Sequence, residues 1–174
     1  MTDTKLSLVA VLSFLLFIAF PAQEAEAQME FELGPTVGFE LSAFESLSVG
    51  ADSRFDFEEV PVTVNPTFDY YFIGDGMGAD VSVSAFSIGA NALYDFDMEG
   101  DFTPYVGAGL NYTTVSVSGD SGFGTIGFSG SSTGLNLIGG AKFDMDALQP
   151  FVQAKFTAAG AGSIGIGGGL LFDL

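Results

Sequence analysis

The chain is dominated by an alternation of apolar and polar residues with a period of two. Between Met29 and Leu41 every odd-numbered residue is apolar, whereas the even-numbered residues are glutamates, glycines and a threonine. The same alternation returns over residues 62–72, 86–96, 106–112, 135–143, 152–156 and 164–174. Because successive side chains of a β-strand point to opposite faces, the pattern predicts strands with one apolar and one polar face.

Short segments rich in turn-forming residues separate these runs. Residues 97–101 and 144–147 are acidic and short, whereas residues 73–80 and 119–132 are longer and rich in glycine, serine and aspartate, which predicts loops. The runs between them predict eight strands, near residues 29–42, 47–58, 60–72, 82–96, 103–118, 133–143, 149–158 and 163–174. An even number of strands, each of about ten residues or more, suits a barrel that crosses a bilayer.

The first 27 residues have the features of a secretory signal peptide. Lys5 precedes an apolar run over residues 6–20, and Ala25 and Ala27 form the small-x-small pattern at which such peptides are cleaved. The apolar run is shorter than the ~20 residues that a membrane-spanning helix needs. We therefore expect cleavage after Ala27, with residues 28–174 forming one β-barrel domain.

Two architectures accommodate an alternating all-β chain. In a soluble barrel the apolar face is the core, whereas in an outer-membrane barrel the apolar face meets lipid and the polar face fills the lumen. The apolar face here ends in aromatic residues, the other face is rich in glycine, and 19 phenylalanines lack a second layer to cover them. These features favour an eight-stranded antiparallel up-and-down transmembrane β-barrel over a soluble one.

Two segments also resemble a known family. Residues 104–112 (PYVGAGLNY) and 134–156 resemble strands of small bacterial outer-membrane β-barrels related to the membrane domains of outer membrane proteins A and W. Gly169, Phe172 and Leu174 resemble the C-terminal assembly signal of those proteins. The resemblance implies a location in the outer membrane, contact with its lipid, folding by the barrel-assembly machinery and a monomeric state. It indicates fold and location more strongly than function, because members of this family differ in function.

Composition removes several classes of function. Acidic residues outnumber basic residues 22 to 4, so the chain lacks the positive charge that nucleic-acid binding requires. It contains no cysteine and no histidine, which excludes thiolate metal sites and the general base on which barrel hydrolases depend. We expect a protein without catalytic activity, bound metal or cofactor.

The basic residues after residue 27 are Arg54, Lys142 and Lys155, and each falls on the polar phase of its strand. The acidic residues expected to share the lumen are Glu30, Glu32, Glu40, Asp52, Asp56 and Asp69. Isolated charges in a dry lumen are costly, so this pattern predicts an ionic network that fills the barrel. Surface charges scattered by chance are the alternative.

The state of the lumen separates the candidate functions. A filled lumen indicates a structural protein of the bacterial envelope, whereas a wet lumen lined with acids indicates a narrow, porin-like channel for small solutes or cations. A third and weaker alternative is a secreted soluble barrel that binds a ligand.

Overall fold

The structure, a computed structural model, describes residues 29–42, 45–57, 60–73, 81–121, 124–145, 148–159 and 162–174. The predicted signal peptide, with Ala25 and Ala27, lies outside these residues. Within the described ranges no helix is long and apolar enough to cross a membrane.

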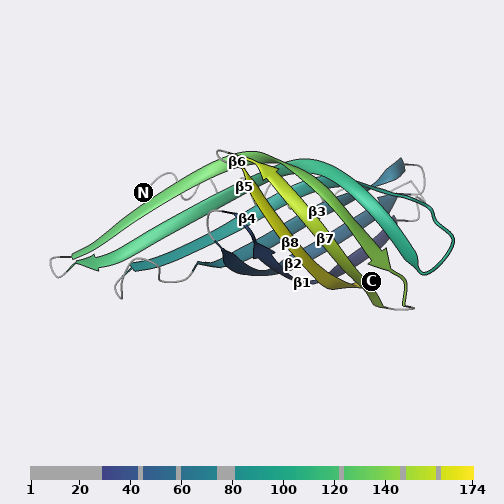
Figure 1. Ribbon diagram of the computed structural model, residues 1–174, viewed down its shortest axis with the longest axis horizontal. Helices are drawn as coiled ribbons and strands as arrows, with labels where there is room; N and C mark the ends of the chain where they lie inside the picture. Colours follow the sequence, from purple (N-terminus) through teal and green to yellow (C-terminus); the bar gives the residue numbers. More distant parts are fainter. Residues whose placement is uncertain are drawn as a thin grey trace, which may run out of the picture.

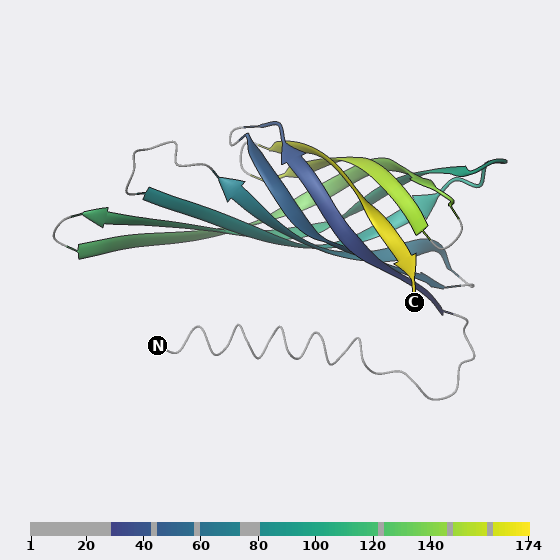
Figure 2. The same ribbon diagram turned by 90° about the horizontal axis from the view of Figure 1, so that it is seen from below.

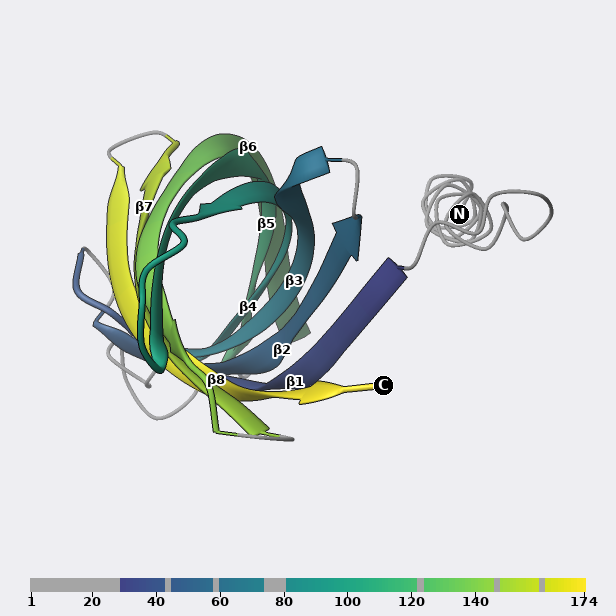
Figure 3. The ribbon, with the colours of Figure 1, turned by 90° about the vertical axis from the view of Figure 1, so that its right-hand side faces the viewer.

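Eight antiparallel strands close into a barrel in which neighbours in sequence are neighbours in space, and β8 pairs back with β1 (Figure 1). The strands are β1 (Met29–Glu40), β2 (Ser46–Phe57), β3 (Val60–Ile73), β4 (Val81–Asp95), β5 (Phe102–Ser121), β6 (Gly124–Phe143), β7 (Leu148–Ala158) and β8 (Ser163–Asp173). Figure 3 looks along the barrel and shows the closed ring. The predicted all-β, eight-stranded, up-and-down fold is confirmed.

The two faces of the barrel are inverted relative to a soluble protein. On the outside, Val37, Leu110 and Leu137 are 61%, 58% and 57% exposed. On the inside, Asp52 and Arg54 are each only 1% exposed. An apolar outer surface around a polar interior is stable in lipid, where the outward side chains are solvated by acyl chains.

Aromatic side chains gather near both ends of the apolar surface. The ring pairs at the end where β1 begins and β8 ends are Phe31–Phe55, Tyr94–Phe96 and Phe102–Phe143, and those toward the other end are Phe68–Phe86 and Tyr70–Phe72. Aromatic girdles mark the two membrane interfaces of such barrels. The opposite end carries the 20-residue strands β5 and β6, which run past the apolar surface, so we assign that end to the outside and the first end to the periplasm.

Strands β5 and β6 extend well beyond the barrel at the outer end (Figure 2). Each has 20 residues, and they pair continuously from Phe102 with Phe143 to Ser121 with Gly124. The prediction that residues 119–132 form a loop was therefore wrong. Glycine and serine signal a turn when read locally, but here pairing with β5 determines the conformation of the segment.

The residue types at the outward-facing positions change along this hairpin. On β5 the outward positions are apolar up to Tyr112 and become Thr114, Ser116 and Ser118 beyond it. On β6 the outward positions are Ser129, Ser131 and Thr133 before the first outward leucine, Leu135. A surface that passes from leucine to serine and threonine at one level indicates that the membrane ends near Tyr112 and Leu135.

Candidate functional site

The side chain of Arg54, on β2, is buried inside the barrel, where it contacts residues of β5 and β7. Its guanidinium carbon lies 4.7 Å from the ring centre of Tyr105 and 4.8 Å from that of Phe151, between two aromatic faces that attract a cation. Nε contacts Oδ1 of Asp52 at 3.3 Å, and Nη2 donates to the Tyr105 hydroxyl at 3.1 Å. That hydroxyl donates in turn to Oε1 of Gln153. The buried charge is thus paired and also held by rings from β5 and β7.

Glycines on neighbouring strands make room for both rings. Gly140 lies directly opposite Tyr105, and a Cβ atom there would come within 2.6 Å of the tyrosine oxygen. Gly169 lies opposite Phe151, and a Cβ atom there would lie 2.8 Å from Cε1 of the ring. The glycine-rich polar phase of the sequence therefore provides volume inside a narrow barrel.

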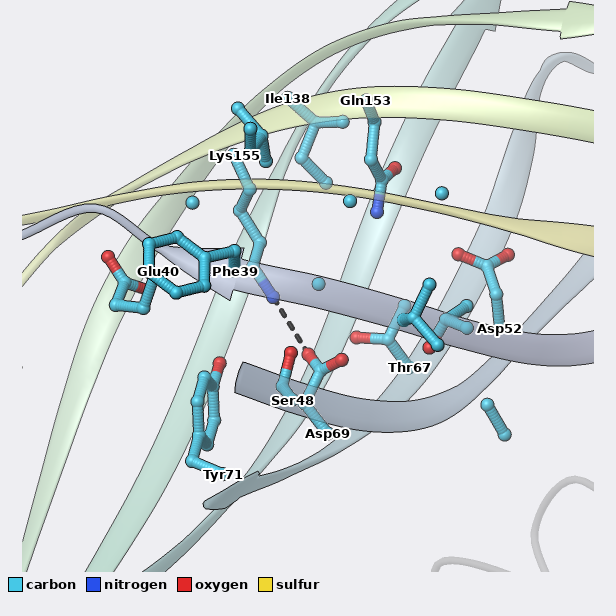
Figure 4. A pocket seen from close by; sticks show the side chains of 18 of the residues that line it. Phe39, Glu40, Ser48, Asp52, Thr67, Asp69, Tyr71, Ile138, Gln153 and Lys155 are labelled. Atoms are coloured by element: carbon cyan, nitrogen blue, oxygen red, sulfur yellow. Dashed lines mark hydrogen bonds and ion pairs between the residues drawn. The ribbon is translucent and has the colours of Figure 1, made fainter. Parts of the chain in front are cut away.

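The two lysines connect strands that are not neighbours. Nζ of Lys155 lies 2.8 Å from Oδ2 of Asp69, as Figure 4 shows. Nζ of Lys142 lies 3.3 Å from Oε1 of Glu32 and 3.9 Å from Oδ2 of Asp95. Each base of the described chain therefore meets at least one carboxylate inside the lumen.

A chain of amide side chains runs around the wall from β2 to β7. Asn65 donates to Asp52 at 2.8 Å, Asn91 to Asn65 at 3.0 Å and Asn136 to Asn91 at 2.9 Å. The Thr157 hydroxyl completes the series by donating to Asn136 at 2.9 Å. Because an amide can donate and accept at once, each asparagine satisfies its neighbours and the network is continuous.

This asparagine ladder crosses β5 at a glycine. Asn91 on β4 and Asn136 on β6 both lie opposite Gly109 in the sheet register. A Cβ atom at Gly109 would lie 2.5 Å from Oδ1 of Asn91, the atom that accepts from Asn136. A side chain at this position would therefore separate the two amides.

Little free space remains above the Arg54 plug. The cavity shown in Figure 4 has a volume of about 40 Å³, and Glu40, Asp69, Tyr71, Gln153 and Lys155 are among the residues that line it. A water molecule needs roughly 10–15 Å³ by this measure, so the cavity holds only a few waters.

The structure brings together some of the predicted lumen residues and not others. Glu32, Asp52 and Asp69 pair with bases, whereas Asp56 accepts a hydrogen bond from Thr63. Glu40 accepts from the Ser42 hydroxyl at 2.8 Å. Glu30 is exposed at the rim, and the described chain offers it no ion-pair partner.

The sequence-based list of lumen residues omitted several contributors, among them Asn65, Asn91, Asp95 and Tyr105. The uncharged Asn65, Asn91 and Tyr105 lie on the polar phase of their strands but were passed over because the list was drawn from charged residues. An aromatic residue among the small residues of a lumen face, as at Tyr105, was the available signal.

The residues of the predicted assembly signal lie on β8 or just after it. Gly169 faces the lumen, Phe172 is exposed on the outer surface, and the backbone N–H of Leu174 donates to the carbonyl of Phe31 at 3.0 Å. Their role in assembly stays a prediction, as do folding by the barrel-assembly machinery and the monomeric state.

An apolar belt with aromatic girdles around a polar interior defines an eight-stranded outer-membrane β-barrel. Residues 42–156 match the Opacity family of porin proteins, and the chain belongs to that family. The family resemblance in the sequence is thereby confirmed, and the class is that of a membrane barrel, not of a secreted soluble carrier.

Solved structures with the same fold include those of three bacterial proteins. Neisserial surface protein A is 18% identical, with a TM-score of 0.64 over 87% of this chain and all of that one. The N-terminal β-barrel domain of Pseudomonas aeruginosa OprF is 17% identical, with a TM-score of 0.64 over 86% and 100% of the two chains. The attachment invasion locus protein of Yersinia pestis is 14% identical, with a TM-score of 0.62 over 86% and 99%. No curated protein sequence matches the chain.

Proposed function

We propose that this protein is a non-enzymatic structural component of the outer membrane whose lumen is closed. The observation that supports this most directly is the Arg54 plug. Arg54, Tyr105 and Phe151 are each 2% exposed or less, and their contacts cross the lumen from β2 to β5 and β7. The cavity next to them has a volume of only about 40 Å³, and we infer that solutes do not pass this level.

The absence of an obvious catalytic apparatus supports the non-enzymatic part of the proposal. Neither histidine nor cysteine occurs in the chain, so a nucleophile would lack its usual base. The lumen carboxylates Asp52, Asp69 and Glu32 are each engaged by a cation. Carboxylates held in this way serve to neutralise buried charge.

A narrow cation-preferring pore is the second candidate. Four buried polar atoms have no hydrogen-bond partner among the described residues, namely Glu32 Oε2, Asp52 Oδ2, Arg54 Nη1 and Asp95 Oδ1. Three of them are carboxylate oxygens, which suit a hydrated cation. This candidate requires the Arg54 side chain to move aside.

Planar bilayer recording distinguishes the two candidates. A closed barrel predicts no conductance steps for the wild type. Phe151→Ala removes one of the two rings that enclose the Arg54 guanidinium in the Arg54 plug, so this variant should produce small steps. Phe156→Ala is the matched control, because Phe156 lies on the same strand but faces outward and is 41% exposed. Steady conductance steps from the wild type would favour the pore. An absence of steps from Phe151→Ala would contradict the proposal that the Arg54 plug closes the lumen.

A further inference from the structure

Among the residues that the structure describes, one edge of the projecting hairpin has no paired strand. β6 pairs with β5 over its whole length, but β7 reaches only the part from Leu135 to Lys142. Along residues 124–133, therefore, the described chain leaves the far edge of β6 without a partner. Gly127 to Thr133 are exposed on both faces, and nothing lies within 4 Å of a Cβ atom built at Gly130.

This edge lacks the features that normally prevent strand addition. Natural sheets protect exposed edges with charged residues, prolines or very short strands. Residues 124–133 (GTIGFSGSST) contain no lysine, arginine, aspartate, glutamate or proline, and the free edge is ten residues long. An unprotected edge of this length is a template for another strand.

An apolar row leads up to the edge on the inward face of the projecting sheet. Ile73 pairs with Val83, Val83 with Val117 and Val117 with Phe128, so four side chains from β3 to β6 lie side by side. Phe128, the last of them, is 77% exposed. The row ends at the free edge with its largest side chain uncovered.

We propose that this edge pairs with the same edge of a second copy, antiparallel and centred on Phe128. A two-fold axis perpendicular to the sheet makes such a contact self-complementary. It also keeps the inward faces of both sheets on the same side, so Phe128 of each copy meets the other. The apolar row of four then becomes a continuous row of eight.

The strand direction requires the second copy to lie in an opposing membrane. In a single membrane β6 runs from outside to inside in every copy, so two copies side by side present parallel strands. A two-fold axis along those strands would put the two Phe128 side chains on opposite faces and interrupt the row. Because the hairpin projects along the barrel (Figure 2), antiparallel pairing joins barrels that point toward each other.

The geometry sets the separation of the two membranes. Phe128 is seven residues from Leu135, the first outward leucine of β6. At about 3.3 Å per residue, each copy contributes roughly 23 Å along the strand, so the bilayers lie within about 45 Å. The net charge of −18 opposes the approach of two copies in dilute buffer, so pairing requires salt to screen it.

Cysteine cross-linking tests this register directly, because the chain contains no cysteine of its own. Two preparations of the Phe128→Cys variant carry tags of different mass, and each is placed in its own population of zwitterionic phospholipid vesicles. The two populations are then mixed in salt and oxidised. We expect a disulfide between the two tags. Ser131→Cys is the control on the same strand: three residues from the centre, it would lie about 20 Å from its counterpart, beyond disulfide reach.

The second measurement is the rate at which vesicles that contain the wild type cluster, detected as an increase in light scattering. Phe128→Ser should slow clustering about tenfold, the effect of losing roughly 1.4 kcal/mol of apolar contact. Ser131→Ala should not slow it. The proposal is overturned if wild-type vesicles do not cluster, if Phe128→Ser clusters equally, or if position 131 cross-links as readily as 128. Disulfides confined to one vesicle population would also overturn it.

Discussion

The ammonium group of Lys155 meets the carboxylate of Asp69 across the full width of the barrel, at 2.8 Å. β7 and β3 are four strands apart in a ring of eight, so this pair connects opposite walls. Backbone pairing connects only neighbouring strands. The ion pair therefore adds a constraint on the cross-section of the barrel that the sheet itself does not supply.

Breaking this pair should destabilise the barrel measurably. Lys155→Met and Asp69→Asn should each lower the free energy of unfolding by about 2 to 4 kcal/mol, because one charge is left largely buried without its partner. The double variant should lose less than the sum, with a coupling of about 1 to 3 kcal/mol. Denaturant unfolding in lipid measures all three. Asp173→Asn, which removes an exposed charge beside Gln149, should cost under about 0.5 kcal/mol. Equal and additive losses would contradict the pairing.

The asparagine ladder predicts that one glycine tolerates no side chain. Gly109→Ala places a methyl group against the carbonyl oxygen of Ala90 and the Asn91 oxygen that accepts from Asn136, and should cost about 1 to 3 kcal/mol through crowding and a broken hydrogen bond. Gly139→Ala is the control on the adjacent strand, since nothing lies within 4 Å of its Cβ position. The same unfolding measurement applies, and indistinguishable results for the two variants would argue against the ladder as a stabilising element.

The position of the membrane boundary predicts different outcomes for one substitution at two places on β6. Leu137→Arg introduces a charge on the lipid-facing surface and should cost about 2 to 4 kcal/mol. Ser131→Arg, six residues earlier on the same outward phase, should be nearly neutral because it lies beyond Leu135 in water. Yield of folded protein after refolding into vesicles, judged by electrophoretic mobility without heating, checks the difference. A large loss at Ser131 would move the boundary outward.

The excess of acidic residues predicts that salt stabilises the protein. With a net charge of −18 and each described base already paired in the lumen, most carboxylates repel one another. Screening shortens the range of that repulsion to about 3 Å at 1 M salt, so the melting temperature in detergent should rise smoothly with NaCl or KCl. A rise that saturates at millimolar calcium would indicate specific cation binding instead.

The strand alternation was sufficient to predict the barrel, because period two is a direct consequence of strand geometry. The first residue of β6 was the main error: the sequence pattern begins that strand at 133, and the structure begins it at Gly124. Glycine and serine do not by themselves indicate a β-strand, so only pairing with β5 determines the conformation of that segment.

The contacts inside the lumen could be predicted from the sequence less well than the fold. Alternation assigns each base to a face of its strand, but it does not say which carboxylate that base meets. Lys155 and Asp69 are 86 residues apart, and their contact depends on the stagger accumulated over four strands. The rings of Tyr105 and Phe151 around Arg54 depend on the same stagger.

The composition of the hairpin of β5 and β6 also affects how this segment crosses the membrane during folding. Its outer part must pass through the hydrocarbon layer before it can emerge on the far side, and every ionised group that makes this passage has to shed its hydration. Between Asn111 and Ala141 the sequence contains a single charged residue, Asp120. Serine and threonine hydroxyls and bare glycine backbone are far less costly to carry across. The composition that leaves the mature edge open to strand addition is therefore also the one that makes the longest external segment easy to translocate.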